Sequence, residues 1–305
     1  MKEIFSYLTG YFKNTNSKVL TACTLLAGLM TYLNFRYAID SKIDQFDPIG
    51  GQFALRYLIF LISFALPYLF YFLFEAKNYF KSPLILLLIL LSPAIFSWKM
   101  VMSTDLPLSN NSNWNYYWNL VIYWPLRLIV ISLMLLIIWK LFYSNESFFG
   151  LTIKRFNWKP YLIMLLIMVP LIAAASTQPD FLNMYPRLAD IDPVLAGVEN
   201  KWFYHLLHEL SYGSDFISVE LFFRGFLILA FIKVAGKDAI LPMACYYCAI
   251  HFGKPLGECI SSYFGGIILG VVVYHTRSII GGLIVHLGIA WLMEIGGYIG
   301  NNVFR

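Results

Sequence analysis

Residues 218–225 read SVELFFRG and place Glu220 and Arg224 inside an apolar segment that runs from about Trp202 to Lys233. Each charge at membrane depth costs roughly a few kcal/mol on insertion scales. On an α-helix the two side chains are four residues apart, so they share a face and can form an ion pair. Two interpretations fit this stretch: a functional site, or an ion pair that only joins two helices.

The composition is that of a membrane protein. Of the 305 residues, 59% are hydrophobic and 13% are charged, whereas a soluble domain carries about a quarter charged residues. The 26 Phe, 21 Tyr and 8 Trp suit a helical membrane protein with aromatic belts at both interfaces. The net charge of +5 is spread over short loops, so it indicates topology and weak attraction to anionic lipid. We therefore expect membrane lipids as partners and no nucleic acid.

Apolar runs of about 20 residues indicate membrane spans. We predict nine, of which the fifth and seventh are short and the sixth is long enough to require a break, expected near Gly213. Lys and Arg are more frequent on the side of the N-terminus, which predicts that the N-terminus is inside. The fold class is thus an all-α, polytopic transmembrane helix bundle of about 8–9 spans, placed in the bacterial cytoplasmic (inner) membrane. The runs cover residues 19–38, 53–74, 83–102, 117–142, 161–176, 202–232, 239–252, 259–275 and 279–299.

The polar residues of the spans gather in the second half of the chain. We predict two parts: residues 1–147 form transmembrane helices without a motif, and residues 148–305 form a helical bundle that carries the polar site. The segment Phe148–Pro160 is amphipathic, so its basic side chains would meet headgroups while its aromatic side chains enter the membrane. An interfacial helix is expected at Ile4–Phe12, and no cleavable signal peptide is evident.

Two histidines lie in apolar segments near the same part of the chain. A ring nitrogen of His251 or His286 at membrane depth must find a partner in the bundle or in a water cavity. A lone histidine there is most often a satisfied core residue, but these two accompany Glu220 and Arg224. Glycines around them allow the helices to approach closely. A shared site would require both histidines at one depth of the membrane.

Three further groups resemble metal or redox motifs, and each has a plainer interpretation that we favour. A helix end rich in Trp, Tyr and His is ordinary interface composition. A C-x-x-C spacing inside an apolar run suits small packing residues, and a D-x-D in a loop suits a solvated acidic segment. The helix end is that of His205, His208 and Glu209, the C-x-x-C spacing is that of Cys245 and Cys248, and the D-x-D is that of Asp190 and Asp192.

In order, spacing and flanking residues, the polar motifs resemble the CPBP family (CAAX protease and bacteriocin-processing, or Abi) of intramembrane glutamic-type proteases. That family carries Glu-Glu-x-x-x-Arg, Phe-x-x-x-His and His-x-x-x-Asn or Asp on successive membrane helices. The likeness extends from about Phe148 to Ile299. Here the motifs read Val219-Glu220-x-x-x-Arg224-Gly225, Tyr247-x-x-x-His251 and His286-x-x-x-Ala290, and Tyr274-His-Thr-Arg277 is also family-like.

The resemblance implies a glutamate and a histidine that activate water, an oxyanion site made by the second histidine and the Asn, and a structural Glu–Arg pair. This chain departs from the pattern twice, because the first glutamate falls on Val219 and the Asn falls on Ala290. A general base contributes about 10²–10⁴-fold and one oxyanion donor about 10²–10³-fold. Glu220 points about 100° away from position 219 on an α-helix. An ion pair with Arg224 would also weaken it as a base.

Two functions therefore stand beside each other, and we favour the first. The first is a pseudoenzyme that binds a transmembrane or lipidated protein or a partner complex. The second is an active protease whose altered site uses His251, His286 and Glu220. No cofactor is expected, and a metal held by the two histidines would lack an identifiable third ligand. Glu294, two turns beyond His286, does not restore the Asn. The candidate site residues are Glu220, Arg224, His251 and His286.

Overall fold

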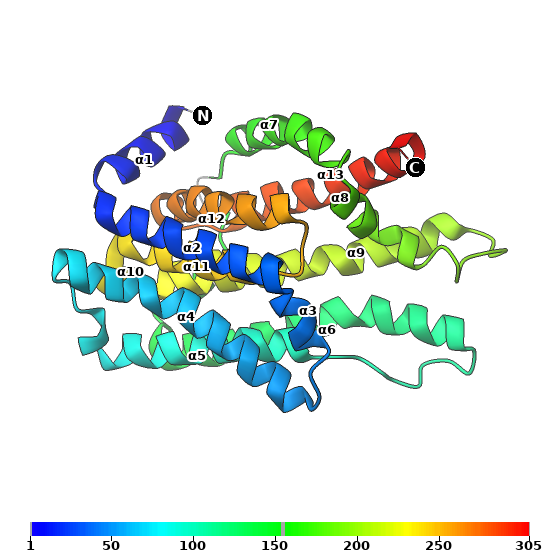
Figure 1. Ribbon diagram of the computed structural model, residues 1–305, viewed down its shortest axis with the longest axis horizontal. Coiled ribbons are helices and arrows are strands. Elements are labelled where there is room, and N and C mark those ends of the chain that lie inside the picture. The colour runs from blue at the N-terminus through cyan, green and yellow to red at the C-terminus, as the bar shows by residue number, and fades with distance from the viewer. Residues whose placement is uncertain (1, 154–155, 305) are drawn as a thin grey trace. The chain divides into compact units, whose positions relative to one another are not determined.

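The structure is a computed structural model that describes residues 2–153 and 156–304. Within these residues the chain is helical and contains no β-strand, so the all-α class is confirmed. One element, η4, is a π-helix, and the other η elements are 3₁₀ helices. The elements are α1 (Lys2–Lys13), α2 (Ser17–Tyr37), α3 (Ile39–Asp44), α4 (Ile49–Glu75), η1 (Tyr79–Lys81), α5 (Pro83–Val101), α6 (Ser112–Phe142), η2 (Phe148–Gly150), α7 (Lys159–Ala175), α8 (Pro179–Met184), η3 (Arg187–Asp190), α9 (Lys201–Glu220), η4 (Leu221–Ala230), α10 (Ile232–Ala235), η5 (Gly236–Ala239), α11 (Ile240–Ala249), α12 (Leu256–Thr276) and α13 (Ile280–Phe304) (Figure 1).

Six of the described helices are long and apolar enough to cross a membrane: α2, α4, α5, α6, α12 and α13. The chain is therefore a multi-pass integral membrane protein. Each of these helices coincides with a predicted apolar run, because the runs are bounded by charged and turn-forming residues. Helix α11 has ten residues, about 15 Å, which is half the thickness of a hydrocarbon core. The total of nine spans and the inside position of the N-terminus stay predictions.

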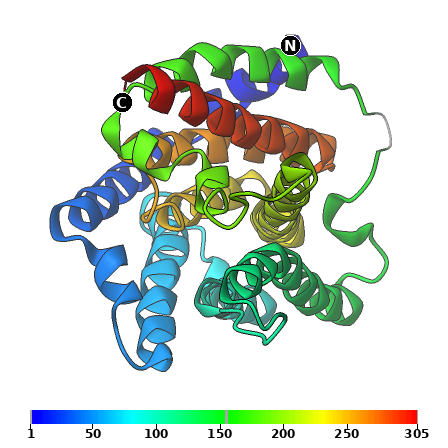
Figure 2. The same cartoon turned by 90° about the vertical axis from the view of Figure 1, so that its right-hand side faces the viewer.

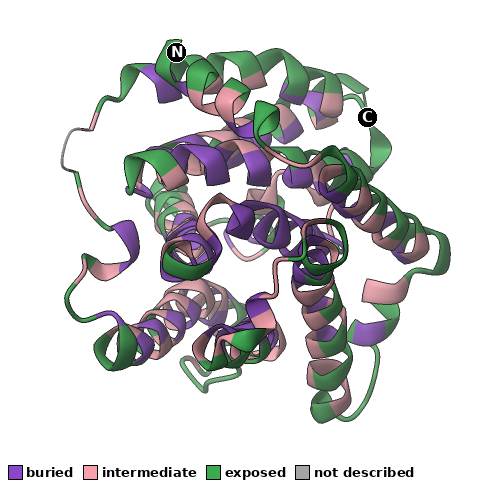
Figure 3. Cartoon of the chain, turned by 90° about the vertical axis from the view of Figure 1, so that its left-hand side faces the viewer, coloured by how far each residue is buried: buried purple, intermediate pink, exposed green. Residues whose placement is uncertain are grey.

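The chain forms two compact units. The first unit holds α1 to α5, the last turns of α6, η2, and the stretch from η4 to α12. Its centre is α11, whose ten residues are all buried and which packs against α2, α4, α12 and η4. An aromatic cluster fills the space beside α11, where the Tyr246 ring lies 5.1 Å from Phe60 and 5.6 Å from Phe64. Buried residues occupy the inward faces of helices, and exposed residues cover their outward faces (Figure 3).

The second unit holds most of α6, α7, α8, η3, α9 and α13. One core of this unit gathers Phe181, Tyr185 and Met293. Another core joins the start of α6 to the loop after η3, where Tyr117 packs with Ile191. Helix α13 approaches the loop after α8 so closely that a Cβ at Gly297 would lie 2.5 Å from the Tyr185 backbone. Only glycine permits this approach.

The segment Phe148–Pro160 is only partly described, because Lys154 and Arg155 lie outside the described residues. Its first residues form η2, where Phe149 is buried and adopts a positive φ of 40°. The carbonyl of Phe149 contacts η4 within the first unit: a Cβ at Gly225 would lie 2.6 Å from that oxygen. The amphipathic character of this segment at a membrane surface stays a prediction.

Candidate functional site

The first motif lies where helix geometry changes. Helix α9 runs without interruption through Gly213 to Glu220, so the predicted break near Gly213 is wrong. The irregularity falls instead directly after Glu220, where η4 continues the helix as a π-helix that includes Arg224. A π-helix has i→i+5 hydrogen bonds and is rare, and short π segments occur often at functional sites. The α-helical spacing used for Glu220 and Arg224 therefore does not hold beyond Leu221.

Glu220 and His286 are in contact within the second unit. The Nδ1–H of His286 donates to Glu220 Oε1 over 3.0 Å, and the glutamate side chain is fully buried. The Phe216 ring packs edge-on against the imidazole, with 4.7 Å between the ring centroids. A Cβ at Gly282 would lie 2.6 Å from Glu220 Oε2, so glycine at this position leaves room for the carboxylate. The third motif thus meets the carboxylate of the first.

His251 and Arg224 both contact Tyr247 within the first unit. His251 Nδ1 lies 2.7 Å from the Tyr247 carbonyl oxygen, one turn earlier in the chain. Because a carbonyl only accepts, Nδ1 carries a proton, and the neutral imidazole then has its lone pair on Nε2. The guanidinium of Arg224 lies over the Tyr247 ring, 3.8 Å from its centroid, as a cation–π contact. The sequence identifies Tyr247 only as the first residue of the second motif, and its two contacts could not be predicted from the sequence.

The two departures from the motif are buried apolar positions. Val219 is 8% exposed and Ala290 is 3% exposed. Neither side chain has an atom that can move a proton or donate a hydrogen bond. The structure gives these positions a packing role, and the loss of two polar groups of the family pattern there stays a prediction.

Glu294 binds backbone groups of a loop and does not replace the Asn that the family pattern has at position 290. Its carboxylate accepts from the backbone N–H of Arg187 at 3.0 Å and of Leu188 at 3.3 Å, and so fixes the start of η3 to α13. It follows His286 by eight residues, which is about 12 Å along a helix. The sequence contains an intramembrane acid at this place but no signal for the loop that it binds.

Aromatic rings, a carboxylate and other thiols surround the remaining motif-like groups. His208 is buried edge-on against Trp124, and His205 Nε2 lies 3.2 Å from Asp192 Oδ1. The cysteines are buried free thiols, which agrees with the packing interpretation of Cys245 and Cys248. Among the described residues, no group of three or more His, Cys, Asp or Glu side chains could hold a metal ion.

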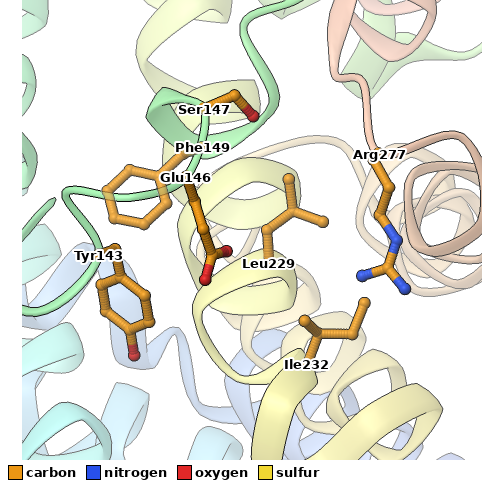
Figure 4. A pocket seen from close by; sticks show the side chains of 7 residues that line it. All are labelled: Tyr143, Glu146, Ser147, Phe149, Leu229, Ile232 and Arg277. Atoms are coloured by element: carbon orange, nitrogen blue, oxygen red, sulfur yellow. The ribbon is translucent and has the colours of Figure 1, made fainter.

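A small pocket of about 240 Å³ lies in the first unit, and its lining includes Arg277. Arg277 enters from the end of α12 and faces Glu146 across the hollow (Figure 4). The Tyr143 hydroxyl donates to the Ala230 carbonyl over 3.0 Å. Burial, together with the nearby charge of Glu146, raises the pKa of Tyr143 to about 12, so the phenol stays a neutral donor. None of the candidate site residues Glu220, Arg224, His251 and His286 lines this pocket.

The fold and these contacts define a multi-pass helical membrane protein with ionisable groups in its apolar helices. Residues 215–292 match the family model described as type II CAAX prenyl endopeptidase Rce1-like. The match covers all three motifs and confirms the resemblance to the CPBP family over this segment. Searches of curated proteins and of solved structures found no match.

Proposed function

We propose that this protein is a non-catalytic relative of the CPBP proteases that binds a transmembrane or lipidated protein in the bacterial cytoplasmic membrane. In this proposal residues 148–305 form the binding part and residues 1–147 are additional helices. The observation that carries the proposal is the 3.0 Å contact between Glu220 and His286, beside a valine at position 219 and an alanine at position 290. The carboxylate of Glu220 is in contact with His286, and the position before it in the chain holds a valine in place of a second glutamate.

The chemistry of peptide hydrolysis explains why this arrangement favours binding. Water attack needs a proton acceptor, and its absence costs about 10²–10⁴-fold. A donor for the oxyanion is worth about another 10²–10³-fold. In neutral His286 the proton on Nδ1 points at Glu220, so Nε2 is an acceptor and cannot donate to an oxyanion. Both catalytic contributions are therefore weakened by the contacts and residue types at this site.

One observation favours an active protease with an altered site. The Nδ1–H of His251 is held by the Tyr247 carbonyl, which gives the neutral ring a basic Nε2. A histidine in this tautomer can act as a general base without a glutamate beside it. In that mechanism Glu220 would stabilise His286 as an imidazolium, which could then donate from Nε2.

A restoration experiment separates the two functions. Wild type, Val219→Glu/Ala290→Asn and His251→Ala are reconstituted in liposomes and assayed for cleavage of a farnesylated CAAX peptide. We expect no cleavage by wild type and measurable cleavage by the double variant. Binding of the same peptide to the wild type, measured by fluorescence anisotropy, should persist without turnover. Cleavage by the wild type that His251→Ala abolishes would establish the protease instead.

The double variant places a carboxylate at a buried position, so its folding needs a control. Val219→Gln/Ala290→Asn introduces polar groups of the same size without a base. If both double variants melt at similar temperatures and only the glutamate form cleaves, the activity comes from the restored base. If the wild type neither cleaves nor binds the peptide, the proposed binding of lipidated proteins is wrong.

A further inference from the structure

A groove of about 500 Å³ lies in the first unit between α2 and α12, with α11 as its floor. The two helices lie side by side (Figure 1 and Figure 2). On α2 the lining includes Thr24, Gly28 and Phe35, which recur at helical spacing along one face. On α12 it includes Ile260 and Phe264, which are four residues apart. The lining includes Cys248, which lies between the motif residues Tyr247 and His251, but none of the four candidate site residues.

Two contacts fix how the groove runs. Thr24 Oγ1 lies 3.1 Å from the Tyr263 hydroxyl, and Thr31 Oγ1 lies 3.8 Å from Cys259 Sγ. Residues later in α2 therefore contact residues earlier in α12, so the two helices are antiparallel. The C-terminal end of α2 therefore lies beside the start of α12, and one end of the groove is formed by Arg36 and Leu256.

The lining calls for an apolar occupant. Tyr32 is 61% exposed, Ile260 47% and Phe264 52%. The weakly polar groups at the floor contact one another, since Thr31 Oγ1 lies 3.5 Å from Cys248 Sγ. Because these groups hydrogen-bond within the protein, the surface that faces an occupant of the groove consists mostly of carbon atoms. Gly28 widens the groove, because a Cβ there would meet nothing within 4 Å.

The length and the charge of the groove identify the occupant. Thr24 and Arg36 are twelve positions apart, or about 18 Å at 1.5 Å per residue. One leaflet of a bilayer has about 15 Å of hydrocarbon. Arg36 lies in the last turn of α2 and is exposed at the end of the groove. Within residues 2–153 and 156–304, no carboxylate forms an ion pair with its guanidinium, which lies 5.5 Å from the centroid of the Tyr37 ring.

We propose that this groove holds one acyl chain of an anionic phospholipid, with the phosphate at Arg36. A leaflet-long apolar groove that ends in a cation matches the two parts of such a lipid, and its open side lets the second chain remain in the bilayer. A Lys or Arg at the membrane surface attracts an anionic headgroup by about 1 kcal/mol. This site is independent of the proposed protein-binding function, since it uses other residues and another ligand.

Native mass spectrometry tests the proposal on the whole protein in detergent with equal amounts of phosphatidylglycerol and phosphatidylcholine. We expect the wild type to retain one lipid and to prefer phosphatidylglycerol. Arg36→Gln should lower that preference about fivefold, because one cation near an anionic group contributes about that much. Arg36→Lys should retain most of it. Retention of the full preference by Arg36→Gln would overturn the headgroup assignment.

The groove itself is tested by a matched pair of glycines. Gly28→Phe fills the groove without meeting protein atoms at Cβ and should reduce bound lipid of both kinds at least fivefold. Gly265→Phe is the control, because Gly265 on α12 also has open space around a Cβ but does not line the groove. Melting temperatures show that both variants fold. Equal lipid retention by the two variants, or equal loss, would show that the lipid is only part of the general lipid shell.

Discussion

At the scale of single residues, the contact between Glu220 and His286 decides what the site can do. The two residues lie 66 positions apart in the chain, and the fully buried Glu220 side chain meets a mostly buried imidazole, where the low dielectric of the interior strengthens a hydrogen bond. The bond orients the imidazole and uses one carboxylate oxygen. Sequence spacing predicts Arg224 as the partner of Glu220, and the structure shows a contact of Glu220 with His286 on the last helix.

A double-mutant cycle measures this contact. Glu220→Ala and His286→Ala are each expected to lower the free energy of unfolding, because each leaves a buried or half-buried polar group without the partner seen here. The coupling energy between them should be about 1–3 kcal/mol. Unfolding in mixed micelles by SDS titration provides the measurement. A coupling energy near zero would mean that the 3.0 Å contact contributes nothing in the membrane.

At the scale of elements, the π-helix after Glu220 is held by a close approach to η2. The Phe149 carbonyl lies so near Gly225 that any side chain would meet backbone atoms rather than a flexible side chain. Phe222, Phe223 and Phe226 on the same turns are buried among aromatic rings. The segment is therefore packed on several sides, and glycine is the residue that fits between them.

Gly225→Ala tests this packing. The added methyl group would lie 2.6 Å from the Phe149 oxygen, so the helix or η2 must shift, at a cost of about 1–3 kcal/mol in the free energy of unfolding. The control is Gly265→Ala, which adds the same group in open space on α12. That variant should be neutral or slightly more stable, since alanine is the better helix former. Similar melting temperatures for the two variants would contradict the close approach.

The sequence predicted elements better than contacts. Helix α5 begins at Pro83, as predicted, because prolines and charges interrupt apolar runs visibly. The continuous course of α9 through Gly213 was missed, since a glycine in a helix is tolerated when its neighbours pack well. The π-helix has no signature in residue types.

Long-range contacts of the site could not be predicted for a related reason. Periodicity places side chains on a face of a helix, but it does not say which other helix lies opposite that face. The approach of His286 to Glu220 depends on Gly282, and the tautomer of His251 depends on a carbonyl of its own helix. The motif positions were therefore predictable, and their hydrogen bonds were not. That all four candidate residues form one site stays a prediction.

At the scale of the whole molecule, the first three spans allow a test of topology that does not depend on the short segments at residues 161–176 and 239–252. Lys13 precedes α2, and Asn113 lies at the start of α6. Between them are α2, α4 and α5, each long and apolar enough to cross the membrane. An odd number of crossings places the two residues on opposite sides, and the Lys and Arg distribution predicts that Lys13 is inside.

Cysteine labelling checks this arrangement. The four native cysteines are buried, so a membrane-impermeant maleimide should leave the wild type unlabelled. In intact cells we expect labelling of Asn113→Cys, and labelling of Lys13→Cys only after permeabilisation, because both positions are exposed. Identical behaviour of the two variants would refute three crossings between them. Reversed behaviour would keep the three crossings but place the N-terminus outside, because the count of crossings and the direction of the first one are independent.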